Sequence, residues 1–312
     1  MKERVNYNIH FVMISAMFVL SNAVITVPFK GADKKNFLSF AIATALGAVF
    51  LYFTSYLINY MYDTKLLSKN PLAVKVFYVL SSAALVFLAV LCFKDYTNFV
   101  SFRMLPQTPR LIVSFIFAFC ILWTSVQKDS VILKFSLFSF VITAIIIIIL
   151  FIISVPRMKL ENIVLLQFPD IKDTVRQTGK YFLNVYITLL PILLYRKCLY
   201  KDMKNKYISS GLLVGSVLLA VCLLNSLLLF GADVACNMDF PYADAISTVT
   251  VGELFTRMDG FSYFVFFAST VIKITVLISG VKILFSRLGI KNKKAVATAC
   301  TVLIFIGDCL VK

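Results

Sequence analysis

Long apolar runs separated by short polar connections dominate the sequence. Nine runs can be delimited: Ile9–Phe29, Phe37–Met61, Ala73–Phe93, Leu111–Val126, Val131–Val155, Tyr181–Tyr195, Tyr207–Phe230, Gly260–Phe285 and Ala295–Val311. A helix needs about 20 residues to cross the hydrocarbon core, so the fourth and sixth runs must borrow flanking residues. Because backbone groups cannot stay unpaired in lipid, all nine runs are predicted to be transmembrane helices.

The bulk composition supports a polytopic membrane protein. The 312 residues are 60% hydrophobic and 15% charged, with a mean hydropathy of +0.91. The net charge of +16 comes from Lys and Arg in the short connections, which is typical of cytoplasmic loops and argues against nucleic-acid binding. His10 is the single histidine and no C-x-x-C occurs among the seven cysteines, so neither a zinc site nor another cofactor is expected.

The charges in the second half of the chain give an orientation. Two connections are rich in basic residues: Arg196, Lys197, Lys201, Lys204 and Lys206 in one, and Lys282, Arg287, Lys291, Lys293 and Lys294 in the other. The connection between them is acidic, and we expect it on the outer side of the membrane, opposite the two basic, cytoplasmic connections. Counting back places the N-terminus in the cytoplasm. The first apolar run continues to Phe29 without a cleavage motif, which predicts an uncleaved first helix.

Two connections, Pro156–Lys180 and Gly231–Asp259, are longer than the rest and mix charged with apolar residues. Short helices on the outer face fit this pattern, and Ile246–Phe255 reads as one amphipathic piece. Plain solvated loops fit it as well. Neither connection is long enough for a separate domain, so residues 1–312 are predicted to form one transmembrane domain.

Polar residues and a proline interrupt the first and sixth runs. Asn22 precedes Pro28 by six residues, and Asn184 precedes Pro191 by seven. Secondary transporters with two inverted repeats begin each repeat with a discontinuous helix that binds the ligand near the midplane. We therefore expect repeats of about 9–155 and 177–312. The alternative is that these residues serve ordinary interhelical bonds and kinks.

Lys273 lies near the middle of the eighth run. A cation there costs roughly 2.5–3.5 kcal/mol on insertion scales, so it needs a partner or a wet cavity. Three interpretations stay open. Its ammonium can replace a sodium ion and couple transport to a proton by losing its charge. It can instead pair structurally with a helix C-terminus or carbonyls, or snorkel from a different helix position.

Four stretches carry a likeness to a known family: the first helix with Pro28, Leu105–Pro109, the block from Phe240 to Asp259, and Val271–Ile274. In them the chain resembles the permease-like B subunit of endospore nutrient germinant receptors, within the amino acid–polyamine–organocation (APC) transporter superfamily. The resemblance implies an all-α APC/LeuT-like inverted-repeat bundle of ten helices, of which nine are found and the tenth is missing. The Gly-x-Glu pattern associated with the family's sixth helix is replaced by Asn184-Val185-Tyr186.

The acidic connection offers a candidate outer cap. Glu253 and Arg257 are four residues apart and can pair on a helix, and Asp259 lies at the start of the eighth helix, where a carboxylate meets the positive end of the dipole. A purely structural cap and a gate over the pore remain alternatives.

The resemblance implies a receptor subunit in the inner membrane of the spore that binds a small nutrient, for which we expect an amino acid, and signals to other receptor subunits. The expected ligand-binding residues are Asn22, Ala23, Val24, Thr26, Asn184, Tyr186 and Thr188, with Lys273 as the pore charge. An autonomous amino-acid or cation transporter is the alternative. An intramembrane enzyme is not expected, because H-E-x-x-H and G-x-S-x-G are absent and Asp308 reads as an unpaired carboxylate.

Overall fold

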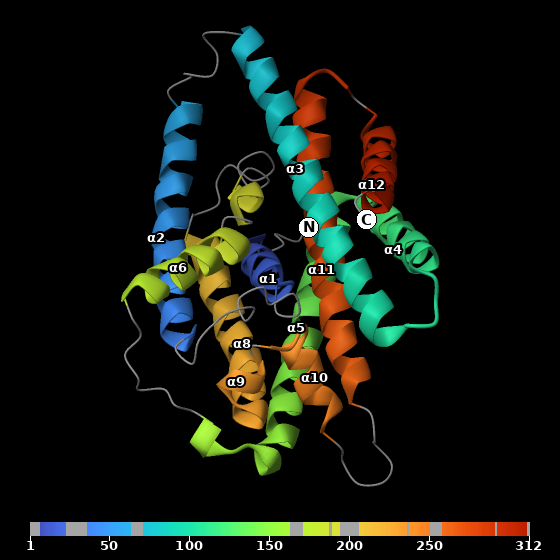
Figure 1. The fold of residues 1–312 in the computed structure, drawn as a ribbon. Coiled ribbons are helices and arrows are strands. Elements are labelled where there is room, and N and C mark those ends of the chain that lie inside the picture. The colour runs from blue at the N-terminus through green and yellow to red at the C-terminus, as the bar shows by residue number, and fades with distance from the viewer. Residues whose placement is uncertain are drawn as a thin grey trace, which may run out of the picture.

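The computed structural model describes residues 7–22, 36–63, 71–162, 171–186, 189–193, 206–235, 237–249, 258–290 and 292–310. Within these ranges the regular structure is entirely helical (Figure 1). The longer helices are α1 (Tyr7–Leu20), α2 (Asn36–Asp63), α3 (Pro71–Phe99), α4 (Arg110–Val126), α5 (Asp129–Ser154), α6 (Ile171–Tyr181), α8 (Lys206–Phe230), α11 (Asp259–Arg287) and α12 (Lys293–Leu310). The α-helical class predicted from the sequence is confirmed.

Five helices are long and apolar enough to cross a membrane among the residues described. They contain the segments Ser39–Tyr56, Val74–Met104, Asp129–Arg157, Tyr207–Phe230 and Gly260–Arg287. The apolar helices α1 and α4 are shorter. The chain is therefore an integral membrane protein, whereas the expected number of nine spans is not established.

Helix α11 is the central helix of the bundle. Within its most apolar window 89% of the residues are buried, compared with 22% for α3. It packs against α1, α3, α4, α5 and α12, and Figure 1 shows it running through the middle of the molecule. A helix that is apolar on all sides is expected in such a position. The ammonium groups of Lys273 and Lys282 on α11 accordingly bond to neighbouring elements, whereas the hydroxyl of Ser269 bonds to carbonyl oxygens of α11 itself.

Glycines allow α8 to lie very close to α1. A Cβ atom built on Gly211 would lie 2.3 Å from the carbonyl oxygen of Val12, and one on Gly215 would lie 2.7 Å from that of Ala16. The spacing of four residues places both glycines on one face of α8, as in other small-x-x-x-small helix contacts in membranes. This contact fixes α1, and with it Ser21 and Asn22 in the turn that follows.

Helix α3 is longer than its apolar run predicts. The run ends at Phe93, but the helix continues through Lys94 and Asp95 to Phe99 and then into the π-helix η2 (Val100–Met104). Burial of Tyr96, Thr97, Phe99 and Val100 explains why the two charged residues do not end it. The Leu105–Pro109 stretch forms the turn before α4.

The two long connections contain short helices, as one of the two sequence interpretations predicted. The first carries the 3-10 turns η3 (Val155–Arg157) and η4 (Leu160–Asn162) before α6. The second carries α9 (Ala232–Ala235) and α10 (Pro241–Ser247), and α10 packs on α8 and α11. The remainder of the predicted amphipathic piece, from residue 250, lies outside the described residues.

Candidate functional site

The ammonium of Lys273 is buried inside the bundle. The residue is 2% exposed, and its Nζ donates a hydrogen bond to Oδ1 of Asn22 at 3.1 Å. The bond joins α11 to the turn that follows α1. It connects the two residues that sequence reasoning had placed in different roles, one as a pore charge and the other as a ligand-binding residue.

The amide of Asn22 is oriented by the end of α1. Its Nδ2 donates to the backbone carbonyl oxygens of Phe18 at 3.0 Å and Val19 at 3.3 Å. These carbonyls belong to the last turn, whose C=O groups have no partner within the helix. With Nδ2 held there, Oδ1 faces Lys273. A cation at a helix C-terminus is also stabilised by the negative end of the helix dipole.

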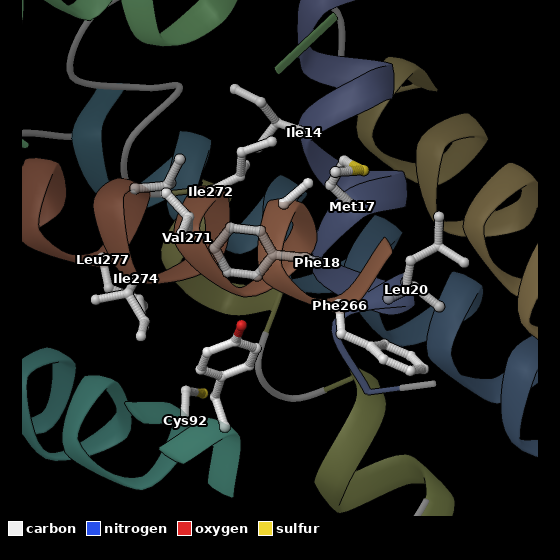
Figure 2. Close-up of a cluster of buried hydrophobic side chains, with 14 of the residues drawn as sticks. Ile14, Met17, Phe18, Leu20, Cys92, Phe266, Val271, Ile272, Ile274 and Leu277 are labelled. Carbon is white, nitrogen blue, oxygen red and sulfur yellow. The ribbon is translucent and has the colours of Figure 1, made fainter. Parts of the chain in front are cut away.

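Helix α3 adds a thiol and a carboxylate to this junction. The Lys273 ammonium lies beside the Cys92 sulfur, and the carboxylate of Asp95, an exposed residue, attracts the ammonium at longer range. Figure 2 shows the apolar surroundings, with Phe18 of α1, Cys92 of α3 and Ile272 and Ile274 of α11 in one cluster. We call the buried Lys273 ammonium, its hydrogen-bond partner Asn22 and the neighbouring Cys92 the Lys273 junction. Asp95 was missed because the third apolar run ends before it.

A second cluster of polar side chains lies around Tyr186. This residue ends the π-helix η5 (Phe182–Tyr186), so the sixth apolar run departs from regular α-helix near its start. The Tyr186 hydroxyl hydrogen-bonds Thr44 of α2 and, at 3.3 Å, Ser216 of α8. Gly47 leaves room for the ring, because a Cβ atom there would lie 2.6 Å from Cγ of Tyr186.

The other expected ligand-binding residues are only partly described. Asn184 lies within η5, but its side chain is outside the described part of the chain, as are Ala23, Val24, Thr26 and Thr188 entirely. Among the described residues, the hydrogen bonds of the predicted site residues therefore define two clusters. One joins Lys273 to the end of α1, and the other joins Tyr186 to α2 and α8. The residues that follow Asn22 and Tyr186 are those expected to complete the site.

The expected outer cap also lies mostly beyond the described residues. Glu253 and Arg257 are outside them, while Asp259 is the first residue of α11, as predicted. Two arginines hold the preceding helix α10 instead. Arg103 of η2 pairs with Asp244, and Arg157 of η3 donates to the carbonyl oxygen of Thr248.

The carboxyl of Asp244 has a raised pKa. Partial burial is the main cause, and the opposing effect of the Arg103 guanidinium does not cancel it. The sequence signal for these contacts was weak, because each arginine lies some 90 to 145 residues from its partner in the chain.

Two charges were misassigned from the sequence. Asp308 of α12 is not unpaired: it forms an ion pair with Arg110 of α4 and accepts hydrogen bonds from Ser114 Oγ at 2.7 Å and Thr97 Oγ1 at 3.2 Å. Lys282 does not lie in a basic loop. It is buried in α11, where Nζ donates to the carbonyl oxygen of Ser125 at 2.7 Å, in the last turn of α4.

No set of three His, Cys, Asp or Glu side chains that could hold a metal ion occurs among the residues searched. The Lys273 junction presents a buried cation whose hydrogen-bond acceptor is Asn22. Such a cation can bind an anionic group, or it can stand where another protein would hold a metal cation.

The fold is that of a secondary transporter. The chain aligns over 98% of its length with 72% of a Na⁺-coupled sialic acid symporter in a substrate-bound outward-open state, with a TM-score of 0.61 and 12% sequence identity. A comparison with curated proteins finds no match. Residues 4–311 match the model of the family described as spore germination protein, and the chain belongs to this family of spore germination permeases.

Proposed function

We propose that the protein is the permease-like subunit of a spore nutrient receptor. In this proposal it binds a small nutrient, an amino acid, within the bundle and passes the binding event to partner subunits. It lies in the inner membrane of the spore with a cytoplasmic N-terminus. Membership of the spore germination family and the transporter fold support the general role.

The observation that carries the proposal is the bond between Lys273 and Asn22. A buried ammonium at the end of α1 offers a charged partner for the carboxylate of an amino acid. The backbone beyond Asn22 would supply further polar groups if the helix is discontinuous there. We assign Ala23, Val24 and Thr26 to one wall of the site, and Asn184, Tyr186 and Thr188 to the other.

The site also offers a means of signalling. A π-helical segment inside an α-helix has a strained hydrogen-bond pattern, and such segments are frequent at functional sites. Binding that favours one arrangement of the α1 end and η5 would shift the population of two bundle states. We propose that Glu253, Arg257 and Asp259 close the outer side in one of these states.

A thermal-shift screen of the purified chain against amino acids tests the proposal. Ligand at 100 times its dissociation constant stabilises a folded protein by about 2.7 kcal/mol, which is readily measured. We expect one or a few amino acids to raise the melting temperature, and Asn22→Leu to remove that rise. If no amino acid shifts the melting temperature of the parent, the nutrient-binding role is wrong.

The second candidate function is autonomous secondary transport. The likeness to a Na⁺-coupled symporter favours it, because the Lys273 ammonium could replace a bound sodium ion. Uptake of a labelled amino acid into proteoliposomes that contain this chain alone would support transport. Binding in the thermal-shift screen without uptake would leave the receptor role and remove the carrier.

A further inference from the structure

An apolar groove lies on the surface between α2 and α6, away from the Lys273 junction. Its volume is about 670 Å³, and it is lined by Ile42, Leu46, Val49, Phe50, Phe53, Thr174, Val175, Thr178, Gly179 and Phe182. This lies within the roughly 300–1,000 Å³ typical of ligand pockets. Three of its apolar side chains, Val49, Phe53 and Val175, are 62–67% exposed. An apolar molecule can therefore enter from the surface.

The C-terminal end of helix α6 is held across α2. Thr178 Oγ1 donates to the carbonyl oxygen of Ser39 at 3.4 Å, Tyr181 packs edge-on against Phe40 at 5.5 Å, and the Phe182 ring lies 5.1 Å from that of Phe50. Figure 1 shows α6 crossing α2 rather than running beside it. The groove lies where the two helices cross, and its α6 lining runs from Thr174 to Gly179.

Basic residues border this groove. Lys172, Arg176 and Lys180 recur every fourth residue on α6, with Asp173 the single acid of the helix. Lys172 is three residues before Val175, and Arg176 three before Gly179, so each is a surface neighbour of a groove residue. Lys172 and Arg176 are exposed. The helix therefore places an apolar face on the groove and cations beside it, as interfacial helices do.

We propose that the α2/α6 groove binds an anionic phospholipid of the surrounding membrane. Its acyl chain occupies the apolar groove, and its phosphate pairs with Lys172 and Arg176. The apolar lining suits a hydrocarbon chain, and the net positive charge of α6 selects an anionic over a zwitterionic headgroup.

The bound lipid would contact the element that carries Tyr186. Phe182 lines the groove and is also the first residue of η5, and Tyr186 lies at the end of the same short π-helix. Gly47, against the Tyr186 ring, follows the groove residue Leu46 on α2. The groove and the polar cluster around Tyr186 are thus both built from α2 and η5.

The experiment is native mass spectrometry of the full chain purified from nanodiscs that contain equal amounts of phosphatidylglycerol and phosphatidylcholine. Gly179→Leu fills the groove without a clash, because a Cβ atom at Gly179 has no other atom within 4 Å. Gly260→Leu is its matched control, since Gly260 is equally unobstructed and lies on α11. Lys172→Gln/Arg176→Gln removes the two cations, and Lys293→Gln/Lys294→Gln removes the same charge from the exposed start of α12.

We expect the parent and both controls to retain phosphatidylglycerol in preference to phosphatidylcholine. Gly179→Leu should lose the bound lipid, and the double charge variant should retain phosphatidylglycerol roughly 30-fold more weakly. Equal retention of the two lipids by the parent, or unchanged retention in either groove variant, overturns the proposal. So does a change of oligomeric mass in Gly179→Leu with lipid retention intact, which would make the groove a docking face for another protein helix.

Discussion

The close contact between α1 and α8 gives a sharp test of the architecture. In Gly215→Ala the new methyl carbon would lie 2.7 Å from the Ala16 carbonyl oxygen, 2.8 Å from Ala16 Cα and 2.9 Å from Val19 Cβ. Non-bonded carbon atoms prefer about 3.5–4.0 Å, so the two helices must separate by most of 1 Å. Gly211→Ala is more severe, with a distance of 2.3 Å to the carbonyl oxygen of Val12.

Two effects compete in these variants. Alanine stabilises a helix interior by up to about 1 kcal/mol relative to glycine. Overpacking a tight contact costs about 1–3 kcal/mol. The clash should prevail at Gly215 and more clearly at Gly211. At Gly179, where the added methyl group has open space, only the favourable effect of alanine is expected.

The assay is thermal unfolding of the purified variants in one detergent. We expect melting temperatures in the order Gly179→Ala, parent, Gly215→Ala, Gly211→Ala, from highest to lowest. Nutrient response should also be lower in Gly211→Ala than in Gly215→Ala, because α1 ends two residues before Asn22 and its displacement moves Asn22 relative to Lys273. If Gly215→Ala and Gly211→Ala melt at or above the temperature of the parent, the close α1/α8 packing is wrong.

Three further variants probe individual contacts. Asp308→Asn should lower the free energy of unfolding by about 1.5–3 kcal/mol, measured by thermal unfolding, because Arg110 loses its charged partner. The double variant Asp308→Asn/Arg110→Gln should lose less stability than the two single variants together, and strict additivity would contradict the pairing. Tyr186→Phe should cost about 1 kcal/mol and shift the nutrient dose–response curve, whereas an unchanged curve would place the site elsewhere. Asp244→Asn should stabilise the protein slightly at neutral pH, because the raised pKa of Asp244 means that folding favours the protonated carboxyl and that the parent loses stability as the pH rises through this pKa. At low pH the parent carboxyl is protonated and the advantage of the variant disappears, so a difference in unfolding free energy that does not change with pH would contradict the raised pKa.

The apolar runs predicted most helix positions closely. The run Leu111–Val126 corresponds to α4 (Arg110–Val126), and the run Tyr207–Phe230 to α8 (Lys206–Phe230). Membrane helices follow from hydropathy because lipid allows so few alternatives for the backbone. The short helices of the connections were anticipated from mixed charged and apolar composition, but α10 ends at Ser247, close to where the amphipathic piece was expected to begin.

Partners of buried charges could not be found in the same way. Asp308 pairs with Arg110 across 198 positions of sequence, and Lys282 meets Ser125 across 157. Nothing local to either residue identifies its partner, because the contact exists only once the helices are packed. Lys273 was singled out correctly as a cation that needs a partner, yet its bond to Asn22 spans 251 positions and required the fold.

In the proposed function, nutrient recognition depends on the charge of Lys273, which Lys273→Met removes. The measurement is the dose–response of germination in spores that carry the variant in place of the parent chain, with Lys134→Met on the exposed face of α5 as the matched control. We expect Lys273→Met to be inserted at the level of the parent and no longer to respond to nutrient, while the control responds normally. A Lys273→Met strain that germinates with the same dose dependence as the parent would contradict it.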